Sequence, residues 1–145
     1  MLNFTYKFRL QPTLNQEILL NKHFGSCRFI YNYFLAKRIE SYKNYGKSLK
    51  RSDNEKELPS LKSEYNWLKE INSQSLQYAI EQLQIAYANF FQNLKNKNNL
   101  FGFPKFKTKN GKQSFRVKQK IKIKNNRLVI LKFPEGIPIV LHREI

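Results

Sequence analysis

The residues best suited to do chemistry in this sequence are the basic ones between positions 105 and 124. No acidic residue lies among them, and the first one to follow is Glu135. Lysine and arginine neutralise phosphates, while nearby phenylalanine rings offer flat surfaces for stacking bases. The stretch therefore predicts nucleic-acid binding, with these cations as candidates: Lys105, Lys107, Lys109, Lys112, Arg116, Lys118, Lys120, Lys122 and Lys124.

Two less specific explanations compete with this one. Aromatic residues in such a stretch often serve core packing, which we expect of Phe106 and Phe115, whereas Phe101 and Phe103 are the stronger stacking candidates. Cations often do no more than keep a surface solvated. Without a counter-charge, so many of them repel one another too strongly for that role alone, so an anionic partner is favoured.

The sequence predicts neither a catalytic residue nor a metal site, and no cofactor. Two-metal cleavage of a phosphodiester needs several carboxylates held together, but Asp53 is the sole aspartate and we expect the glutamates on helix surfaces beside lysines. His23 and His142 have no cysteine, aspartate or second histidine at metal-ligand spacing. Cys27 is the only cysteine, which excludes a disulfide framework or zinc ribbon within the sequence.

The composition agrees with a folded chain that has a polyanionic partner. Its 145 residues suffice for about one domain, and 41% hydrophobic residues argue against disorder. The 27 Lys and Arg residues outnumber 10 Asp and Glu, for a net charge of +17, which is typical of nucleic-acid binding. No long apolar run and no secretory leader are recognisable, so we expect no membrane contact and a cytoplasmic location.

Alternating patterns at both ends of the sequence predict a sheet. Residues 4–10 alternate apolar with polar or basic side chains, as a strand with one apolar face does. It has no partner nearby, so it must pair with strands predicted at 114–117, 121–123, 128–131 and 137–141, with turns at Asn125-Asn126 and 133–136. The predicted fold class is α+β: a helical bundle (13–97) inserted into a small antiparallel β-sheet or partial barrel formed by both chain ends (1–12 and 98–145).

The helical part begins with a stretch that predicts a hairpin of two helices. Thr13 and Gln16 have capping-box spacing, Gly25 stands where a left-handed helix cap would fall, and Ser26 could cap a second helix ending near Gly46. Helix-turn-helix DNA-binding folds contain such a unit, although a simply packed hairpin is favoured on spacing alone. The basic residues that could contact DNA from it are Arg28, Arg38 and Lys43.

Two more helices are predicted after the hairpin. Ser52 and Glu55 have capping-box spacing, but Pro59 should end that helix early unless it restarts. Ser73 is expected to cap the longest helix, residues 74–97. Its apolar seam could form a dimeric coiled coil, but over only about three heptads packing against the hairpin is favoured. The seam consists of Leu76, Ile80, Leu83, Tyr87, Phe90 and Leu94.

Several short motifs are spread along the sequence, and their order and spacing are informative. The first are Tyr6-Lys-Phe-Arg-Leu-Gln-Pro12, Gln16 and Phe24-Gly-Ser-Cys-Arg-Phe-Ile-Tyr-Asn-Tyr-Phe-Leu35. Later ones are Trp67-Leu-Lys-Glu-Ile71, Ser75-Leu-Gln77, Ala86-Tyr-Ala-Asn-Phe-Phe91, Gly102-Phe-Pro-Lys-Phe-Lys107 and Ser114-Phe-Arg116. Together they cover essentially the whole sequence, which resembles the insertion-sequence OrfB (TnpB) proteins. Those are transposon-encoded, RNA-guided DNA nucleases related to type V CRISPR effectors.

The resemblance implies a fold and a set of contacts. In such proteins both chain ends form a wedge-like β-barrel around a helical recognition domain, and together these bind the guide RNA scaffold and read a short motif beside the DNA target. By position, the readers would be Arg51, Glu55, Ser73, Gln74, Gln77 and, less closely matched, Lys120. Gln77 can bond an adenine edge bidentately, while Glu55 and Ser73 are weaker readers, so the recognised motif could differ or be lost. The nucleic-acid backbone, RNA included, would be held by Lys7, Arg9, Lys105, Lys107, Lys109, Lys112, Arg116, Lys118, Lys122 and Lys124.

One departure from the family changes the expected activity. Family members continue into an RNase H-like nuclease domain with a zinc-binding insert, whereas this sequence stops at Ile145. We therefore expect a protein that binds structured RNA and duplex DNA without cleaving DNA by itself, alone or beside a separate nuclease chain. The sequence leaves open a helix-turn-helix regulator, a structural protein dimerising along 76–94, or a product without a present role, and it does not predict the oligomeric state.

Overall fold

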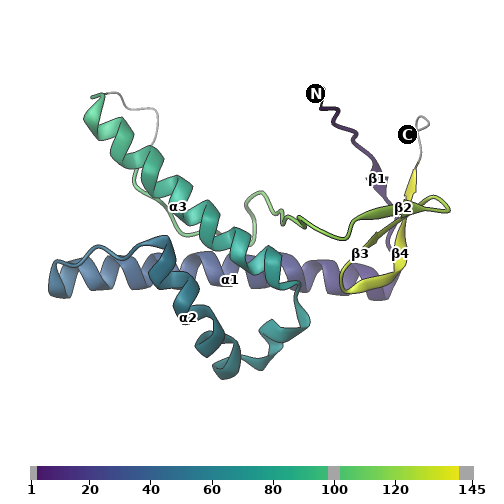
Figure 1. The fold of residues 1–145 in the computed structure, drawn as a ribbon, viewed down its shortest axis with the longest axis horizontal. Helices are drawn as coiled ribbons and strands as arrows, with labels where there is room; N and C mark the ends of the chain where they lie inside the picture. The colour runs from purple at the N-terminus through teal and green to yellow at the C-terminus, as the bar shows by residue number, and fades with distance from the viewer. Residues whose placement is uncertain (1–2, 98–101, 141–145) are drawn as a thin grey trace.

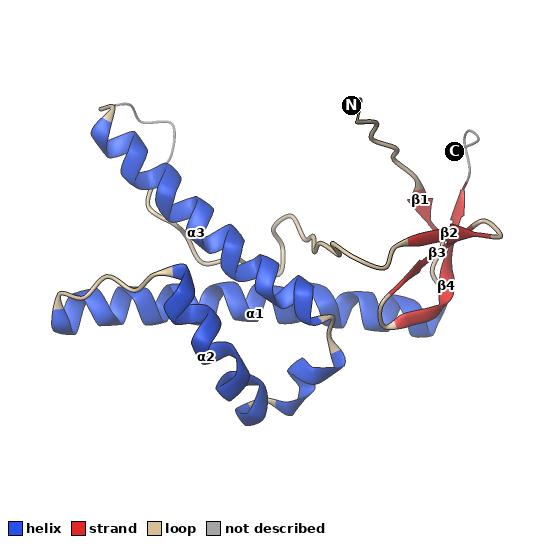
Figure 2. Cartoon of the chain, viewed as in Figure 1, coloured by secondary structure: helices blue, strands red, loops and turns tan. Residues whose placement is uncertain are grey.

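The computed structural model describes residues 3–97 and 102–140 and confirms the predicted α+β class (Figures 1 and 2). A bundle of helices occupies one side of the molecule and an antiparallel sheet the other. In chain order, the elements of the described residues are β1 (Arg9–Leu10), α1 (Leu14–Tyr45), α2 (Arg51–Glu64), the 3-10 helix η1 (Asn66–Glu70), α3 (Ser73–Lys95), β2 (Lys122–Lys124), β3 (Arg127–Ile130) and β4 (Phe133–Val140).

One helix of 32 residues, α1, stands where a helical hairpin was predicted, so that prediction is wrong (Figure 1). The capping box of Thr13 and Gln16 is confirmed, but Gly25 lies inside α1 and the left-handed cap is Gly46, with φ of 64°. The reason is that buried residues recur every three or four positions on both sides of Gly25, so one continuous helix keeps them on a single face, whereas a turn at Gly25 would not. The buried residues in these steps are Leu20, His23, Cys27, Ile30 and Phe34.

The core of the bundle lies between α1 and α3, which confirms the packing predicted for the long helix. Leu76, Ile80 and Leu83 are fully buried in a cluster with α1 side chains. The dimeric coiled coil would need these same residues, so its seam is already occupied within one chain. Towards the end of α3, Leu94 is exposed. None of the helices in the described residues is long and apolar enough to cross a membrane.

The starts of α2 and α3 correct the predicted caps. Lys50, not Ser52, precedes α2, and the Asp53 side chain accepts a hydrogen bond from its backbone N–H (2.8 Å). Pro59 lies inside α2, because the buried Leu58 and Leu61 hold that stretch on the core despite the missing N–H. At α3 the capping side chain is Asn72, one residue before the predicted Ser73. Side-chain capping signals at neighbouring positions are alike, so tertiary packing chooses between them.

The sheet has the order β1-β4-β3-β2, with all neighbours antiparallel, so both chain ends contribute to it (Figure 2). The predicted turn at Asn125-Asn126 is confirmed, and both residues have positive φ, as a two-residue hairpin turn of type I′ requires. The next turn falls at Leu131-Lys132 rather than at 133–136, which instead begin β4.

Two predicted strands are shorter than expected or absent. Of residues 4–10, only Arg9–Leu10 form a strand in the described part of the chain, paired with Val140 and Ile139 of β4. Residues 114–117 form no strand; their backbone is held by α3, where the Ser75 hydroxyl donates to the Arg116 carbonyl (2.7 Å). An alternating pattern predicts one apolar face, and here that face meets helices.

The sheet is fastened to the first turns of α1. Gln16, already part of the capping box, donates from Nε2 to the Gly136 carbonyl (2.7 Å) across a buried contact. Gly136 has φ of 78°, and a Cβ there would approach the Arg127 Cβ to 2.8 Å, so a larger residue would break this junction. Beneath it, Leu20 of α1 forms a second core with sheet residues Ile130, Phe133 and Ile137.

Candidate nucleic-acid interface

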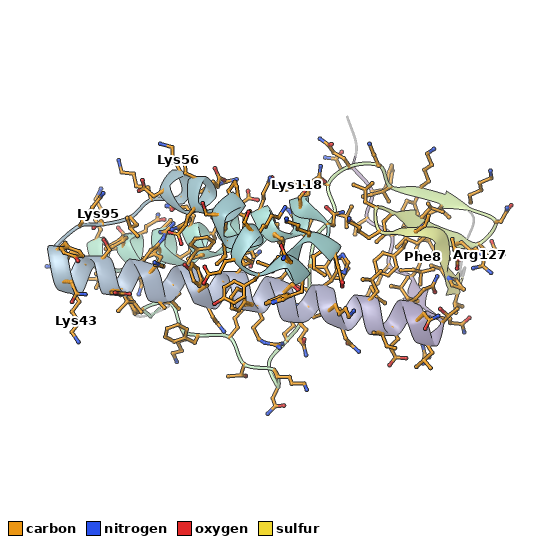
Figure 3. All side chains as sticks on the ribbon, turned by 90° about the horizontal axis from the view of Figure 1, so that it is seen from below. Phe8, Lys43, Lys56, Lys95, Lys118 and Arg127 are labelled. Carbon is orange, nitrogen blue, oxygen red and sulfur yellow. The ribbon has the colours of Figure 1, made fainter. Side chains whose placement is uncertain are left out.

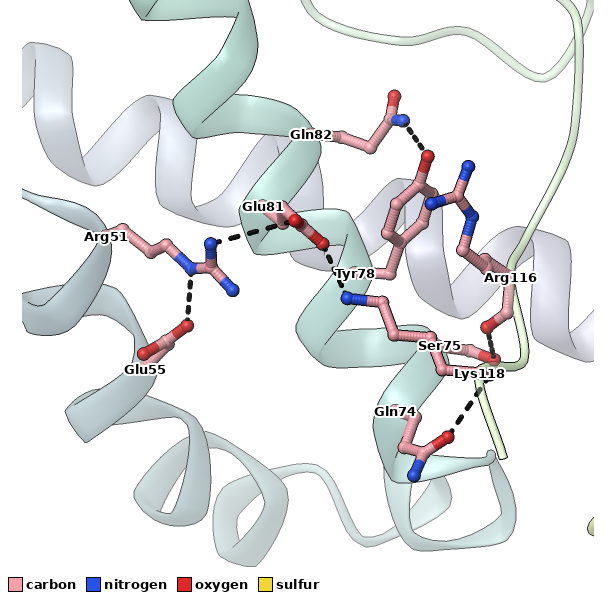
Figure 4. Close-up of polar contacts among 9 residues, drawn as sticks. All are labelled: Arg51, Glu55, Gln74, Ser75, Tyr78, Glu81, Gln82, Arg116 and Lys118. Carbon is pink, nitrogen blue, oxygen red and sulfur yellow. Dashed lines mark hydrogen bonds and ion pairs between the residues drawn. The ribbon is translucent and has the colours of Figure 1, made fainter. Parts of the chain in front are cut away.

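A cluster of polar side chains forms where the start of α2, the first half of α3 and residues 116–118 meet (Figure 4). From α3 it takes Gln74, Tyr78 and Glu81, which share one face because they lie three and four positions apart. We call the following residues the α2–α3 polar cluster: Arg51, Glu55, Gln74, Tyr78, Glu81, Arg116 and Lys118.

Carboxylates hold the cations of this cluster in place. Arg51 donates from Nε to Glu55 (2.7 Å), and its Nη1 lies 3.8 Å from Glu81. Lys118 reaches the other Glu81 oxygen at 2.9 Å. The hydrogen bond from Lys118, together with the charges of Lys118 and Arg51, lowers the pKa of Glu81 below its usual value. Glu81 therefore stays ionised and fixes one cation from each side.

The same cluster fastens the segment after α3. The Arg116 guanidinium lies 4.3 Å above the Tyr78 ring, and the Lys118 backbone N–H donates to Gln74 Oε1 (3.3 Å). The Gln74 side chain uses its oxygen in this contact, so its amide N–H groups can donate to a ligand. Such stacking and hydrogen bonding orient the side chains before any partner arrives.

The predicted DNA readers are only partly brought together. Arg51, Glu55 and Gln74 belong to the polar cluster. Ser73 and Gln77 are exposed on the same side of α3, four positions apart. Lys120 is exposed on the segment two residues beyond Lys118, with φ of 57°. Their roles as readers remain predictions.

Sequence reasoning missed Tyr78 and Glu81. Both follow Gln74 at helical spacing, and that spacing is the signal that could have placed them on the same face of α3 as Gln74. What could not be foreseen is the approach of α2, which supplies Arg51, because it depends on tertiary packing.

The basic segment, residues 102–124, leads back from the end of α3 towards the sheet along α1 and α3 (Figure 1). All nine predicted cations in it are exposed. Among the described residues, Lys118 alone of these nine forms an ion pair. The other eight leave their charge uncompensated, as phosphate contacts require.

Backbone contacts position the middle of the basic segment. Asn32 of α1 bonds the Lys107 backbone twice, accepting from its N–H (2.8 Å) and donating to its carbonyl (2.9 Å). The Lys107 ammonium lies 4.7 Å above the Tyr31 ring. Arg28 donates to the Gln113 side chain at 3.2 Å. The segment is thus pinned at its backbone and by the Lys107 side chain, while Lys105, Lys109 and Lys112 are exposed.

The aromatic residues of the segment divide differently from the prediction. Phe115 packs against both cores, as expected. Phe106 is 52% exposed, so its assignment to the core is wrong; the bonds of Asn32 hold this stretch and its ring is not needed there. Phe103 is partly exposed and meets the Tyr87 ring edge-on. Phe101 lies outside the described residues, as does His142.

The remaining backbone-contact candidates lie on the sheet or just before it. Arg9 is exposed on β1 and Lys7 two residues before it, whereas Lys122 and Lys124 are exposed on β2. Because β1 and β2 are opposite edges, the structure does not bring these two pairs together. A single ligand would have to extend across the sheet to contact all four.

Two buried ionisable groups support the fold. His23 donates from Nδ1 to the Leu19 carbonyl and accepts from the Asn72 backbone N–H, and burial lowers its pKa. Arg38 is only 5% exposed and donates to Asn54 and Gln84. Arg38 therefore cannot contact DNA as the hairpin hypothesis assumed. The Cys27 thiol is an ordinary buried one, since burial raises its pKa to about 12.

Comparison with known proteins identifies the family. The model of the helix-turn-helix domain of OrfB proteins of IS605 elements matches residues 1–47. "Virulence protein VsdF" of Salmonella dublin is 36% identical over 115 residues, which are 73% of this chain and 93% of VsdF. "Putative RNA-guided DNA endonuclease InsQ" of Escherichia coli K12 is 32% identical over 131 residues, which are 88% of this chain and 31% of InsQ. The chain belongs to the OrfB/TnpB family.

A third relative sets the extent of the likeness. "Putative RNA-guided DNA endonuclease" of Streptomyces pristinaespiralis is 33% identical over 88 residues, 59% of this chain and 22% of that protein. This OrfB/TnpB chain thus spans less than a third of the two endonucleases it matches. The matched domain supports nucleic-acid binding as the general function of this region. Its name describes a helix-turn-helix, but α1 runs without a turn from Leu14 to Tyr45 in this OrfB/TnpB chain.

Proposed function

We propose that this chain binds both structured RNA and duplex DNA, as the guide-binding and motif-reading part of an OrfB/TnpB-type protein. The observation that carries the proposal is the uncompensated charge of the basic segment beside the compensated charge of the α2–α3 polar cluster. Uncompensated cations suit the phosphates of an RNA scaffold, and oriented side chains suit the edges of bases.

The DNA-facing part of the proposal uses α3. Ser73 and Gln77 are exposed on α3, on the side of the helix that also carries Gln74, and Glu81 further along this helix contacts Arg51 of α2. Glutamine can bond an adenine bidentately and arginine a guanine, so Gln77 and Arg51 are the readers whose chemistry fits best. Lys120 extends this surface along the segment, and Glu55 orients Arg51.

The RNA-facing part uses exposed lysines that form no ion pair among the described residues. Lys105, Lys109 and Lys112 are exposed and project from a segment whose backbone is already fixed. If about six to ten phosphates are contacted, affinity should fall by about 10³–10⁵ between 50 and 200 mM salt. These residues supply binding rather than phosphodiester cleavage.

A salt-titrated binding assay tests the proposal. It compares a structured RNA from the flanking transposon end, the same sequence as duplex DNA, and an unrelated RNA of equal length. Preference for the cognate RNA that survives at moderate salt supports guide binding. Equal and steeply salt-sensitive binding to all three ligands would reduce the proposal to a generic basic surface, and absence of binding would end it.

A further inference from the structure

An open groove lies on the side of α1 that α3 does not cover. One wall is η1 with Trp67, the floor is α1, and the other side borders the basic segment. We call it the Trp67 groove and define it by Lys22, Gly25, Arg28, Phe29, Asn32 and Trp67.

Aromatic rings form the apolar part of the groove. Phe29 meets Trp67 with ring centroids 5.1 Å apart and an angle of 67° between the rings. Tyr65 supports both from behind, 5.1 Å from Phe29 and 6.0 Å from Trp67. Trp67 nevertheless remains 44% exposed. A large ring held in one orientation and still open to solvent is a ready surface for stacking.

The floor is open because Gly25 has no side chain. Its φ is not in the left-handed region, and an added Cβ would find only Arg28 Nη2, at 3.6 Å. The helix therefore does not need glycine there for its geometry. A glycine inside a helix costs about 0.5–1 kcal/mol relative to alanine, and what Gly25 provides in return is the open space on the floor of the groove.

The rim of the groove is cationic on the side of the basic segment. Arg28 donates to Gln113, and Asn32 bonds the Lys107 backbone, so the groove and the segment share an edge. The acidic residue of the rim, Glu70, pairs with Lys22 at 3.3 Å. Rings flanked by cations match the chemistry of a nucleotide, with its flat base and anionic phosphate.

We propose that the Trp67 groove accepts one unpaired nucleobase of a bound RNA, stacked on Trp67 and Phe29, with the adjoining phosphates against the basic segment. The inference rests on the proposed nucleic-acid binding and adds a site to it, distinct from the motif-reading face of α3. A second copy of this chain is a poorer occupant, because the net charge of +17 repels it.

Trp67 is the chain's sole tryptophan, so its fluorescence reports on this groove alone. The full chain is titrated with a ten-nucleotide oligoadenylate RNA while binding is followed separately by anisotropy of a labelled copy. We expect Trp67 quenching to rise in step with the anisotropy. A blunt DNA duplex should raise the anisotropy without equal quenching, because its bases remain stacked on one another.

The matched variants are Gly25→Leu, which fills the floor, and Ala36→Leu, which places the same leucine side chain at an exposed position of α1 outside the groove. Gly25→Leu should abolish the quenching and weaken single-strand binding by about 5- to 100-fold. Ala36→Leu should change neither. Far-UV circular dichroism checks that both variants keep their helices.

Three outcomes would overturn the inference, and they can be told apart. Binding that leaves Trp67 unquenched and is not weakened by Gly25→Leu removes the groove but keeps the proposed function. Absence of any anisotropy change removes both. A shift of Trp67 emission with protein concentration, without RNA, assigns the groove to a second copy.

Discussion

The α2–α3 polar cluster and the basic segment contain the same kinds of cation but differ in how their charge is balanced. In the cluster, Glu55 and Glu81 hold Arg51 and Lys118 at fixed positions. In the segment, the remaining cations project without carboxylate partners among the described residues. A cation that is paired with a carboxylate attracts phosphate less strongly, but the ion pair fixes the orientation of its side chain. We therefore propose that sequence discrimination and affinity depend on different surfaces of one chain.

The largest effect should come from removing charge from the basic segment. Changing Lys105, Lys107, Lys109 and Lys112 to glutamine should reduce the loss of affinity for structured RNA between 50 and 200 mM salt by about 10²-fold, because about four counterion-releasing contacts disappear. Binding isotherms at several salt concentrations measure this. The control removes the same charge elsewhere, at four exposed residues of the helical part of the chain: Lys43, Lys56 and Lys95, labelled in Figure 3, and Lys47. Equal losses in both variants would contradict a localised surface.

A smaller and different effect should follow from Gln77→Ala on the reading face. Preference at one position of the duplex should fall by about 5- to 100-fold while the salt dependence stays unchanged, because an edge contact to a base carries no phosphate charge. Selection from a randomised duplex library measures this preference. Gln92→Ala, at an exposed position near the end of the same helix, is the control. A uniform loss over all sequences would place Gln77 among backbone contacts instead.

The stability that buried His23 gives to the fold beneath both surfaces should decrease at acidic pH. His23 touches Phe115 of the basic segment and accepts from Asn72 at the start of α3. Burial keeps its pKa in the folded state below the ordinary 6.5, so the unfolded chain binds more protons below that pH. Stability is then full above about pH 6.5 and falls as the pH decreases towards the folded-state pKa, by at most about 1.4 kcal/mol per pH unit.

Urea unfolding between pH 7.5 and 5 measures this slope. His23→Leu should flatten it, even though the variant is less stable at every pH. If His23→Leu keeps the slope of the parent chain, other groups are responsible.

The smallest effect, and the one that tests the balance most directly, is expected of Glu81→Gln. Freed from Glu81, Lys118 should raise affinity for any duplex by about two- to fivefold and steepen the salt dependence by about one contact, while Arg51 keeps its ion pair with Glu55. Sequence preference should decline at the same time. Because the pKa of Glu81 is lowered, the parent chain should show no such gain between pH 7 and 5. Glu40→Gln, on an exposed part of α1, is the control.

The sequence predicts the α+β class and the contribution of both ends to one sheet because those depend on local alternation and on the lack of a nearby partner. The cap at Thr13 and the turn at Asn125-Asn126 were predictable for the same reason, since each is defined within a few residues. The prediction of a helix end at Gly25 was wrong because a glycine that ends a helix and a glycine inside one look the same locally. Only the spacing of apolar residues on both sides of Gly25 distinguishes the two cases.

The candidate site was harder to predict than the fold. Nothing in the local sequence distinguishes Lys118 from Lys112. In the structure only Lys118 pairs with Glu81, which lies 37 residues earlier and contacts it because the segment packs on α3. Phe106 and Phe115 both lie next to basic residues of the segment, yet only Phe115 packs against the two hydrophobic cores. Such differences depend on long-range geometry.

The unbroken course of α1 has a further consequence for how chains of this kind can change length. At 1.5 Å per residue its 32 residues span about 48 Å, and each residue turns the helix by about 100°. One residue inserted near Gly25 would rotate the sheet-bearing end against α3 and the Trp67 groove, whereas an insertion of seven residues restores their facing within about 20°. Related chains should therefore vary freely in the connections before and after α1 but alter this helix only in steps close to whole turns.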